Sequence, residues 1–112
     1  MDGPIFVVFT NPKEGGEDEY NEWYTNTHLD DVLKVDGFKA AQRFVLADTE
    51  HAKTAPYRYL AIYEGDEGKM ELAIESLAQA GREGRLPGSA AVLDPDRKTW
   101  WYLPITDRRD AP

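Results

Sequence analysis

The sequence predicts an α+β fold in which four strands and two helices follow one another in the order β-α-β-β-α-β. Three observations predict it: short apolar runs rich in β-branched and aromatic residues, two segments with helical periodicity, and turns containing Gly or Pro between them. The chain has 112 residues, which suits one hydrophobic core. We assign residues 1–106 to a single domain and residues 107–112 to a polar C-terminal tail.

The first half of the chain predicts a strand followed by a helix. The apolar run Ile5–Thr10 predicts the strand, and Asn11-Pro12 ends it. The acidic residues 17–19 suit the first turn of a helix, where backbone N–H groups are exposed. The apolar face of this helix consists of Tyr20, Trp23, Tyr24, Thr27 and His28. Leu29 and Leu33 fall outside this face, which predicts a break or bend just after His28 and a second short helical piece beyond it.

The second half of the chain predicts three strands and one helix. Alternating patterns predict strands at Phe38–Leu46 and Tyr57–Glu64, and the last strand is expected at Lys98–Ile105. An apolar stripe at helical spacing predicts a helix over Asp66–Arg82, with Asp66 as its N-cap. This order is the split βαβ arrangement of a ferredoxin-like fold, an antiparallel four-stranded sheet with both helices on one face.

A sheet covered on one face only leaves its other face bare. Several strand residues that point to that face are apolar, and soluble monomers rarely expose a large apolar patch. A second copy packed sheet to sheet about a twofold axis would cover it. We therefore expect a homodimer.

Composition excludes several classes of function. Acidic residues outnumber basic ones 21 to 13, a net charge of −8, which disfavours nucleic-acid and anionic-membrane partners. With no cysteine, the chain has no disulfide, thiolate nucleophile or zinc–thiolate site. No signal peptide or membrane-spanning run is apparent, so we expect a cytoplasmic protein without cofactors.

An ordered set of motifs resembles the EthD-like branch of the dimeric α+β barrel superfamily. The motif residues lie in the segments Asn11-Pro12, 17–24, 27–33, Gly37-Phe38 and 42–44. Asp30 stands where the family pattern has proline, so the bend after His28 is less strongly enforced in this chain. The resemblance implies a homodimer whose sheets form a shared barrel, with a small-molecule pocket between each sheet and its own helices. Relatives include polyketide cyclases, an isomerase, cofactor-free monooxygenases and haem-degrading enzymes, so the resemblance does not define one reaction.

His28 is the first candidate for a catalytic role. It shares a helix face with Tyr24 and should point towards the sheet. In the resemblance, it occupies the place of a pocket tyrosine in the polyketide cyclases. A neutral imidazole in an aromatic cavity can relay a proton near neutral pH. The alternative is a buried histidine that caps the helix and bonds a backbone carbonyl.

Tyrosines and tryptophans supply further candidates. Tyr24, Tyr59 and Tyr63 could donate to a substrate carbonyl or enolate, and we group them with His28 as catalytic candidates. Alternatively, they simply pack in the core. Trp23 and Trp101 are expected in the wall of the cavity or in the core.

Two polar residues are candidates for substrate binding. Arg43 lies within a predicted strand and could hold a carboxylate, or it could form an ion pair with Asp31 or Glu64. Asn11 could donate to a ligand oxygen, or it could shape the turn after the first strand. His51 lies in a polar loop and is expected to be solvated.

Metal and haem sites are not expected. His28 and Asp31 have the spacing of a possible metal pair, but two ligands are too few. The second predicted helix lacks the histidine that haem-handling relatives place there.

Three functions are compatible with these features. The first is a cofactor-independent isomerase, cyclase or lyase that moves protons on a hydrophobic cyclic, aromatic or polyketide-like compound. The second is a cofactor-free monooxygenase of a phenolic substrate. The third is a dimer that binds a hydrophobic small molecule without changing it. The first places acid/base chemistry at His28, the second would consume O₂ during turnover, and binding in the third would survive the loss of His28.

Overall fold

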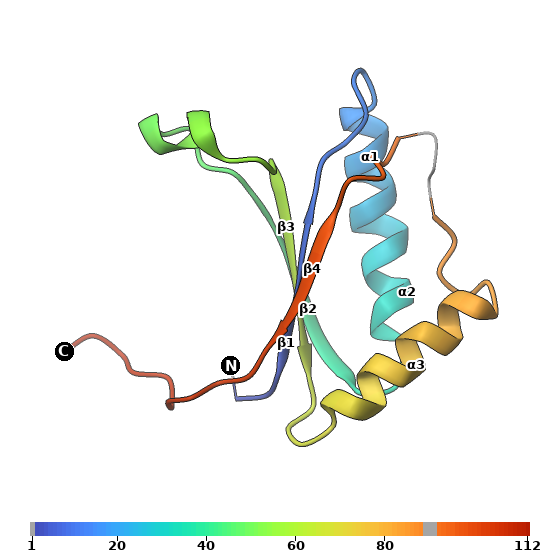
Figure 1. Cartoon of the computed structure of the whole chain (residues 1–112), viewed down its shortest axis with the longest axis vertical. Coiled ribbons are helices and arrows are strands. Elements are labelled where there is room, and N and C mark those ends of the chain that lie inside the picture. Colours follow the sequence, from blue (N-terminus) through green and yellow to red (C-terminus); the bar gives the residue numbers. More distant parts are fainter. Residues whose placement is uncertain (1, 89–91) are drawn as a thin grey trace.

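Four antiparallel strands form one sheet in the order β2-β3-β1-β4, and the helices cover one face of it (Figure 1). This computed structural model describes residues 2–88 and 92–112. The predicted ferredoxin-like α+β fold is confirmed, because the chain follows the β-α-β-β-α-β order with both helical segments on the same side. The strands are β1 (Ile5–Thr10), β2 (Phe38–Val45), β3 (Tyr59–Gly65) and β4 (Lys98–Tyr102).

Residues 17–33 form one continuous helical segment rather than two pieces separated by a break. It consists of α1 (Glu17–Trp23), a π-helical turn η1 (Tyr24–His28) and α2 (Leu29–Leu33). The N–H of Leu29 donates to the carbonyl of Tyr24, five residues earlier, which is the hydrogen bond of a π-helix. The predicted second helical piece is confirmed as α2, which begins directly after His28, but the backbone stays helical at this point and no break precedes it. The π-helical turn contains one residue more than an α-helical turn, so the residues after it are rotated towards the sheet. Val32 therefore lies in the core and Leu29 packs against it.

Several element boundaries differ from the predicted ones. The strand β3 begins at Tyr59, so Tyr57 precedes it, and β4 ends at Tyr102 because it pairs there with Ile5, the first residue of β1. The helix α3 (Met70–Arg82) begins four residues after the expected N-cap, because residues 66–69 form a turn first. The loop between β2 and β3 contains a short 3₁₀ helix, η2 (Glu50–Thr54). None of the helices described in residues 2–88 and 92–112 has the length and apolar character of a membrane span.

The core lies between the sheet and the helices. Alternation along β3 buries Tyr59, Ala61 and Tyr63 on the helix side. Gly37, between α2 and β2, has a φ of +98°. A Cβ at Gly37 would lie 2.9 Å from the backbone of Ala73 in α3. Glycine at this turn therefore permits the close approach of α3 to the turn after α2.

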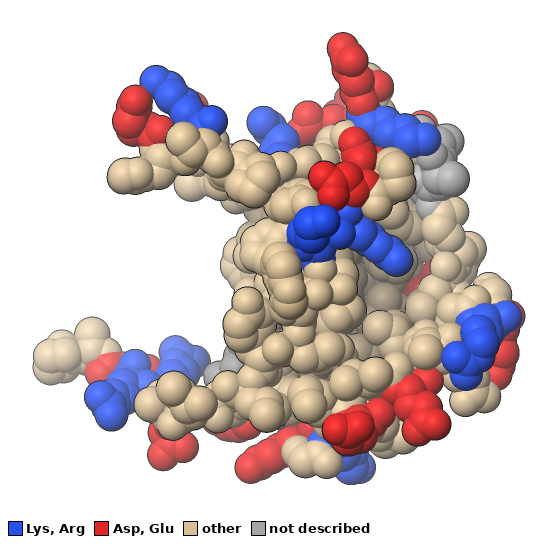
Figure 2. All heavy atoms as spheres, viewed as in Figure 1, with Lys and Arg blue, Asp and Glu red and all other residues tan. Residues whose placement is uncertain are grey.

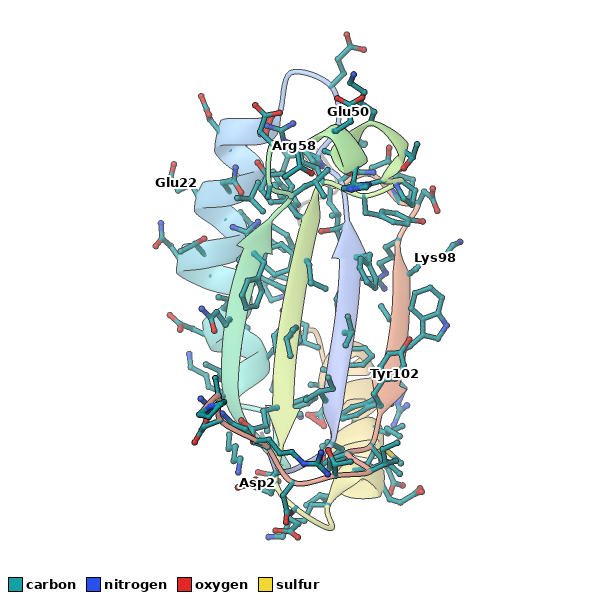
Figure 3. The ribbon with its side chains drawn as sticks, turned by 90° about the vertical axis from the view of Figure 1, so that its left-hand side faces the viewer. Asp2, Glu22, Glu50, Arg58, Lys98 and Tyr102 are labelled. Atoms are coloured by element: carbon teal, nitrogen blue, oxygen red, sulfur yellow. The ribbon has the colours of Figure 1, made fainter. Side chains whose placement is uncertain are left out.

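The opposite face of the sheet is uncovered and largely apolar (Figure 3). Phe44, Trp100 and Tyr102 are 40%, 49% and 53% exposed. The β2–β3 loop and the C-terminal segment 103–112 both extend on this side, one from each end of the sheet (Figure 1). The space-filling view shows the surface hollowed between these two arms (Figure 2).

Candidate functional site

A cavity of about 470 Å³ lies between the sheet and the helices. Side chains of β1, β3 and β4 line one side, and the helical segment α1-η1-α2 and α3 line the other, together with Leu86, Gly88, Leu93 and Arg97 between α3 and β4. Its wall is mainly apolar and includes Phe6, Val8, Trp23, Val32, Leu77 and Trp101. The polar or charged side chains in the lining are Thr10, Tyr24, His28, Tyr63, Arg97 and Thr99.

His28 ends the π-helical turn and lies in the wall of this cavity. Its ring stacks on Trp23 with a centroid distance of 4.8 Å and meets the edge of Tyr24 at 4.9 Å. No other described side chain hydrogen-bonds its Nδ1, which is buried. Aromatic packing, rather than a carboxylate partner, therefore sets the orientation of this imidazole.

His28 is neutral at physiological pH. Burial lowers the pKa of His28 to about 4, although Asp31 opposes this effect, and the charges of Arg97 and Arg43 lower the pKa further. A buried N–H without an acceptor is rarer than a buried acceptor without a donor. The unpaired Nδ1 therefore favours the tautomer with its hydrogen on Nε2, in which Nδ1 keeps a lone pair that can accept a proton.

Tyr24 and Tyr63 place a hydrogen-bonded pair of hydroxyls beside His28. The Tyr63 hydroxyl donates to that of Tyr24 at 3.2 Å, and both residues are buried and line the cavity. Burial raises the pKa of Tyr24 to about 12 and raises the pKa of Tyr63 as well. Both side chains are therefore neutral phenols at physiological pH, and Tyr24 can pass its own hydrogen to a ligand oxygen.

Trp23 and Trp101 form walls of the cavity at its two sides. Trp101 stacks on Phe6 at a centroid distance of 4.8 Å and on Phe38 at 5.7 Å. These flat rings suit a flat cyclic ligand.

Arg43 is not among the residues that line the cavity. Its Nη1 donates to Thr25 Oγ1 at 2.8 Å and its Nη2 donates to Asn21 Oδ1 at 2.9 Å. The guanidinium also lies over three tyrosine rings. Its Cζ is 4.5 Å from the ring centroid of Tyr24 and 5.3 Å from those of Tyr20 and Tyr59. Arg43, Tyr20, Tyr59, Asn21 and Thr25 form what we call the arginine cluster. This cluster joins the helix to the sheet.

Tyr59 and Asn11 also lie outside the cavity lining. The Tyr59 hydroxyl donates to Glu17 and accepts from Asn21 Nδ2 at 3.0 Å. The Asn11 side chain accepts from the N–H of Arg58 at 2.7 Å and donates to the carbonyl of Pro56 at 3.0 Å. Both residues are therefore engaged in holding neighbouring segments together.

Arg97 is a cavity residue that sequence reasoning missed. It immediately precedes β4, whose Thr99 and Trp101 line the same cavity. Its side chain is exposed, which places it at the rim. Arg97 directly precedes a strand, and the one sequence signal that could have indicated it is the alternation of Arg97, Thr99 and Trp101 along an extended segment.

His51 lies on η2, is exposed, and is not among the residues that line the cavity. No cluster of three or more His, Asp or Glu side chains that could hold a metal ion occurs within residues 2–88 and 92–112. The side chains available to a ligand are thus one imidazole, two phenols, two threonines and one guanidinium.

The fold and the cavity define an α+β protein of ferredoxin-like architecture with an internal cavity between its sheet and its helices. No protein-family model matches the chain, and no curated protein matches it. Among solved structures, the chain is similar to a protein described as a "putative monooxygenase" from Shewanella loihica PV-4. The two share 15% identity with a TM-score of 0.59, over 96% of this chain and 99% of the other. At this identity the similarity shows a shared fold.

Proposed function

We propose that the protein is a cofactor-independent enzyme that moves protons on a hydrophobic cyclic, aromatic or polyketide-like compound. One observation carries the proposal: a neutral imidazole with an unpartnered buried nitrogen lies in the wall of an otherwise aromatic and apolar cavity. An isomerase, cyclase or lyase of this kind needs a residue that holds and releases a proton near the reacting carbon.

The three polar groups beside one another have separate roles in this proposal. His28 accepts the proton from the carbon next to the substrate carbonyl at the unprotonated nitrogen of its neutral ring, and it returns this proton to carbon as the enolate collapses. Tyr24 donates to the carbonyl oxygen, and its own oxygen accepts from Tyr63. A donor aimed at this oxygen stabilises the negative charge that develops there. Trp23 and Trp101 exclude water and pack against the ring of the substrate.

Hydrogen–deuterium exchange into 2-tetralone tests this proposal without knowledge of the natural substrate. The ketone has acidic hydrogens next to its carbonyl, and NMR follows their replacement in D₂O. We expect the protein to accelerate exchange, and His28→Ala to reduce that acceleration by about 100-fold. His51→Ala is the matched control, because it removes the exposed histidine, and it should exchange at the wild-type rate.

Two results would contradict the proposal. Exchange that is equally fast in His28→Ala would remove the imidazole from the chemistry. Binding of 2-tetralone with no acceleration at all would instead favour a protein that binds its ligand without changing it.

A cofactor-free monooxygenase is the second candidate, and the name of the Shewanella loihica protein favours it. In that reaction a phenol such as 1-naphthol and O₂ would give 1,4-naphthoquinone and water. Both oxygen atoms are accounted for, and no external reductant is needed. Consumption of O₂ in step with loss of the phenol would identify this activity, and proton exchange without O₂ uptake would reject it.

We further propose that the protein is a homodimer of the EthD-like branch. The motif residues around His28 support the branch, and the uncovered apolar face supports the dimer. Light scattering should give twice the chain mass of 12.7 kDa. Trp100→Glu, on the exposed face, should shift the protein to the monomer, whereas a monomeric wild type would contradict the proposal.

A further inference from the structure

The cavity lining has an unusual charge for this chain. Acidic residues outnumber basic ones 21 to 13 in the sequence, yet the described residues that line the cavity include no carboxylate. They include one arginine, Arg97, and one histidine, His28, which is neutral at physiological pH. The described lining of the cavity therefore carries a positive charge, although the net charge of the chain is −8.

Arg97 has no ion-pair partner within residues 2–88 and 92–112. The acidic side chains next to it in the sequence are already engaged. Asp96 Oδ1 accepts from Tyr57 at 3.2 Å and pairs with Lys98 at 3.5 Å. Asp94 Oδ1 accepts from the N–H of Asp96 at 2.8 Å. The guanidinium is thus left available to a ligand.

We propose that Arg97 binds the carboxylate of an aromatic or cyclic acid whose ring occupies the apolar part of the cavity. This inference rests on the proposed function, because it concerns the ligand of the same site. The planar fork of a guanidinium matches a carboxylate with two parallel hydrogen bonds. The position of Arg97 at the rim leaves the carboxylate near solvent and the ring against Phe6 and Trp101.

The arrangement also orders the ligand within the cavity. Arg97 lines the same cavity as His28 and Tyr24, so a ligand whose carboxylate it holds brings its ring system beside these two side chains. The charge of Arg97 acts on both of these groups and lowers the pKa of each. A bound carboxylate would neutralise part of that charge, and the substrate would thereby alter the site that acts on it.

Two ligands of the same size and different charge show how much the ligand's charge, apart from its shape, contributes to binding. We would measure the Kd of 1-naphthoate and of its neutral analogue 1-naphthamide by calorimetry at pH 7.5. Wild-type protein should bind 1-naphthoate about tenfold more tightly than 1-naphthamide. Arg97→Gln should abolish that preference and leave the Kd of 1-naphthamide unchanged. Lys98→Gln is the matched control, since it removes an adjacent positive charge and should behave as the wild type.

The outcomes distinguish the two proposals. If Arg97→Gln keeps the preference for 1-naphthoate, or if the wild type has none, the role of Arg97 is wrong while the cavity remains a binding site. If neither compound binds the wild type, the proposed ligand class fails together with the proposed function. An unchanged thermal unfolding midpoint in Arg97→Gln confirms that any loss of preference is not a loss of fold.

Discussion

The arginine cluster and the cavity lie on either side of Tyr24, contain similar residue types and differ in how completely their polar groups are paired. In the arginine cluster, Arg43 is bonded to Asn21 and Thr25 and covered by three tyrosine rings. In the cavity, the buried Nδ1 of His28 lacks a described partner, and no described carboxylate pairs with Arg97. Paired groups stabilise a fold, whereas unpaired groups beside open space are available to a ligand.

Breaking the arginine cluster should cause the largest loss of stability. Arg43→Leu removes two charged hydrogen bonds and leaves Asn21 without its donor. We expect the free energy of unfolding to fall by about 3 kcal/mol, measured by urea denaturation. The Kd for 2-tetralone, measured below the unfolding transition, should stay within about twofold of the wild-type value. A large loss of affinity with stability intact would place Arg43 in the binding site instead.

The second prediction concerns pH and the unpaired imidazole. The pKa of His28 is about 4 in the folded protein and 6.5 for an ordinary histidine, so the unfolded chain binds more protons between these values. Stability should therefore fall as the pH drops from about 6.5 to about 4. His28→Leu lacks this loss. Relative to that variant, the wild type should lose about 2 kcal/mol between pH 7 and pH 4, after allowance for partial exposure.

Glu17 provides an internal check on that pH experiment. The hydrogen bond from Tyr59 lowers the pKa of Glu17, so this carboxylate also loses favourable interactions as the pH falls. The effect is present in the wild type and in His28→Leu, and it cancels in the difference. Parallel stability curves for the two proteins would show that folding leaves the pKa of His28 near its ordinary value of 6.5, and would contradict the prediction.

The third and smallest prediction uses two tyrosines on the same strand. Tyr59→Phe removes hydrogen bonds to Glu17 and Asn21 in the arginine cluster and should lower stability by about 1–2 kcal/mol without a change in proton exchange. Tyr63→Phe removes the donor to Tyr24 and should lower stability by about 1 kcal/mol or less. It should, however, slow proton exchange several-fold. Slower proton exchange in Tyr59→Phe, with unchanged exchange in Tyr63→Phe, would place Tyr59 and not Tyr63 at the site of chemistry.

Periodicity predicts which face a residue occupies, and this was sufficient for most of the fold and part of the site. The helical spacing of Trp23, Tyr24 and His28 placed them towards the sheet, where they line the cavity. Alternation on β3 placed Tyr59 and Tyr63 on the same face, which is also observed. It could not show that Tyr59 lies under α1, away from the cavity, because position along a strand relative to an overlying helix depends on packing.

The features that sequence reasoning missed have weak or ambiguous signals in the sequence. The π-helical turn appears in the sequence only as a slip in phase, and a break explains that slip equally well. Arg97 follows an irregular segment, so its place at the rim depends on the path of the chain between α3 and β4. The pairing of Arg43 with Asn21 and Thr25 depends on side-chain geometry across two elements.

An NMR titration of the His28 imidazole nitrogens, with and without 2-tetralone, measures both the protonation of this ring and its contact with a ligand. We expect the His28 ring to stay neutral down to about pH 4 and its resonances to shift when the ketone is added, while those of His51 stay unmoved by the ketone. Protonation of His28 near pH 6.5, or ketone binding that leaves its resonances unmoved, would show that His28 is not a neutral imidazole facing the ligand.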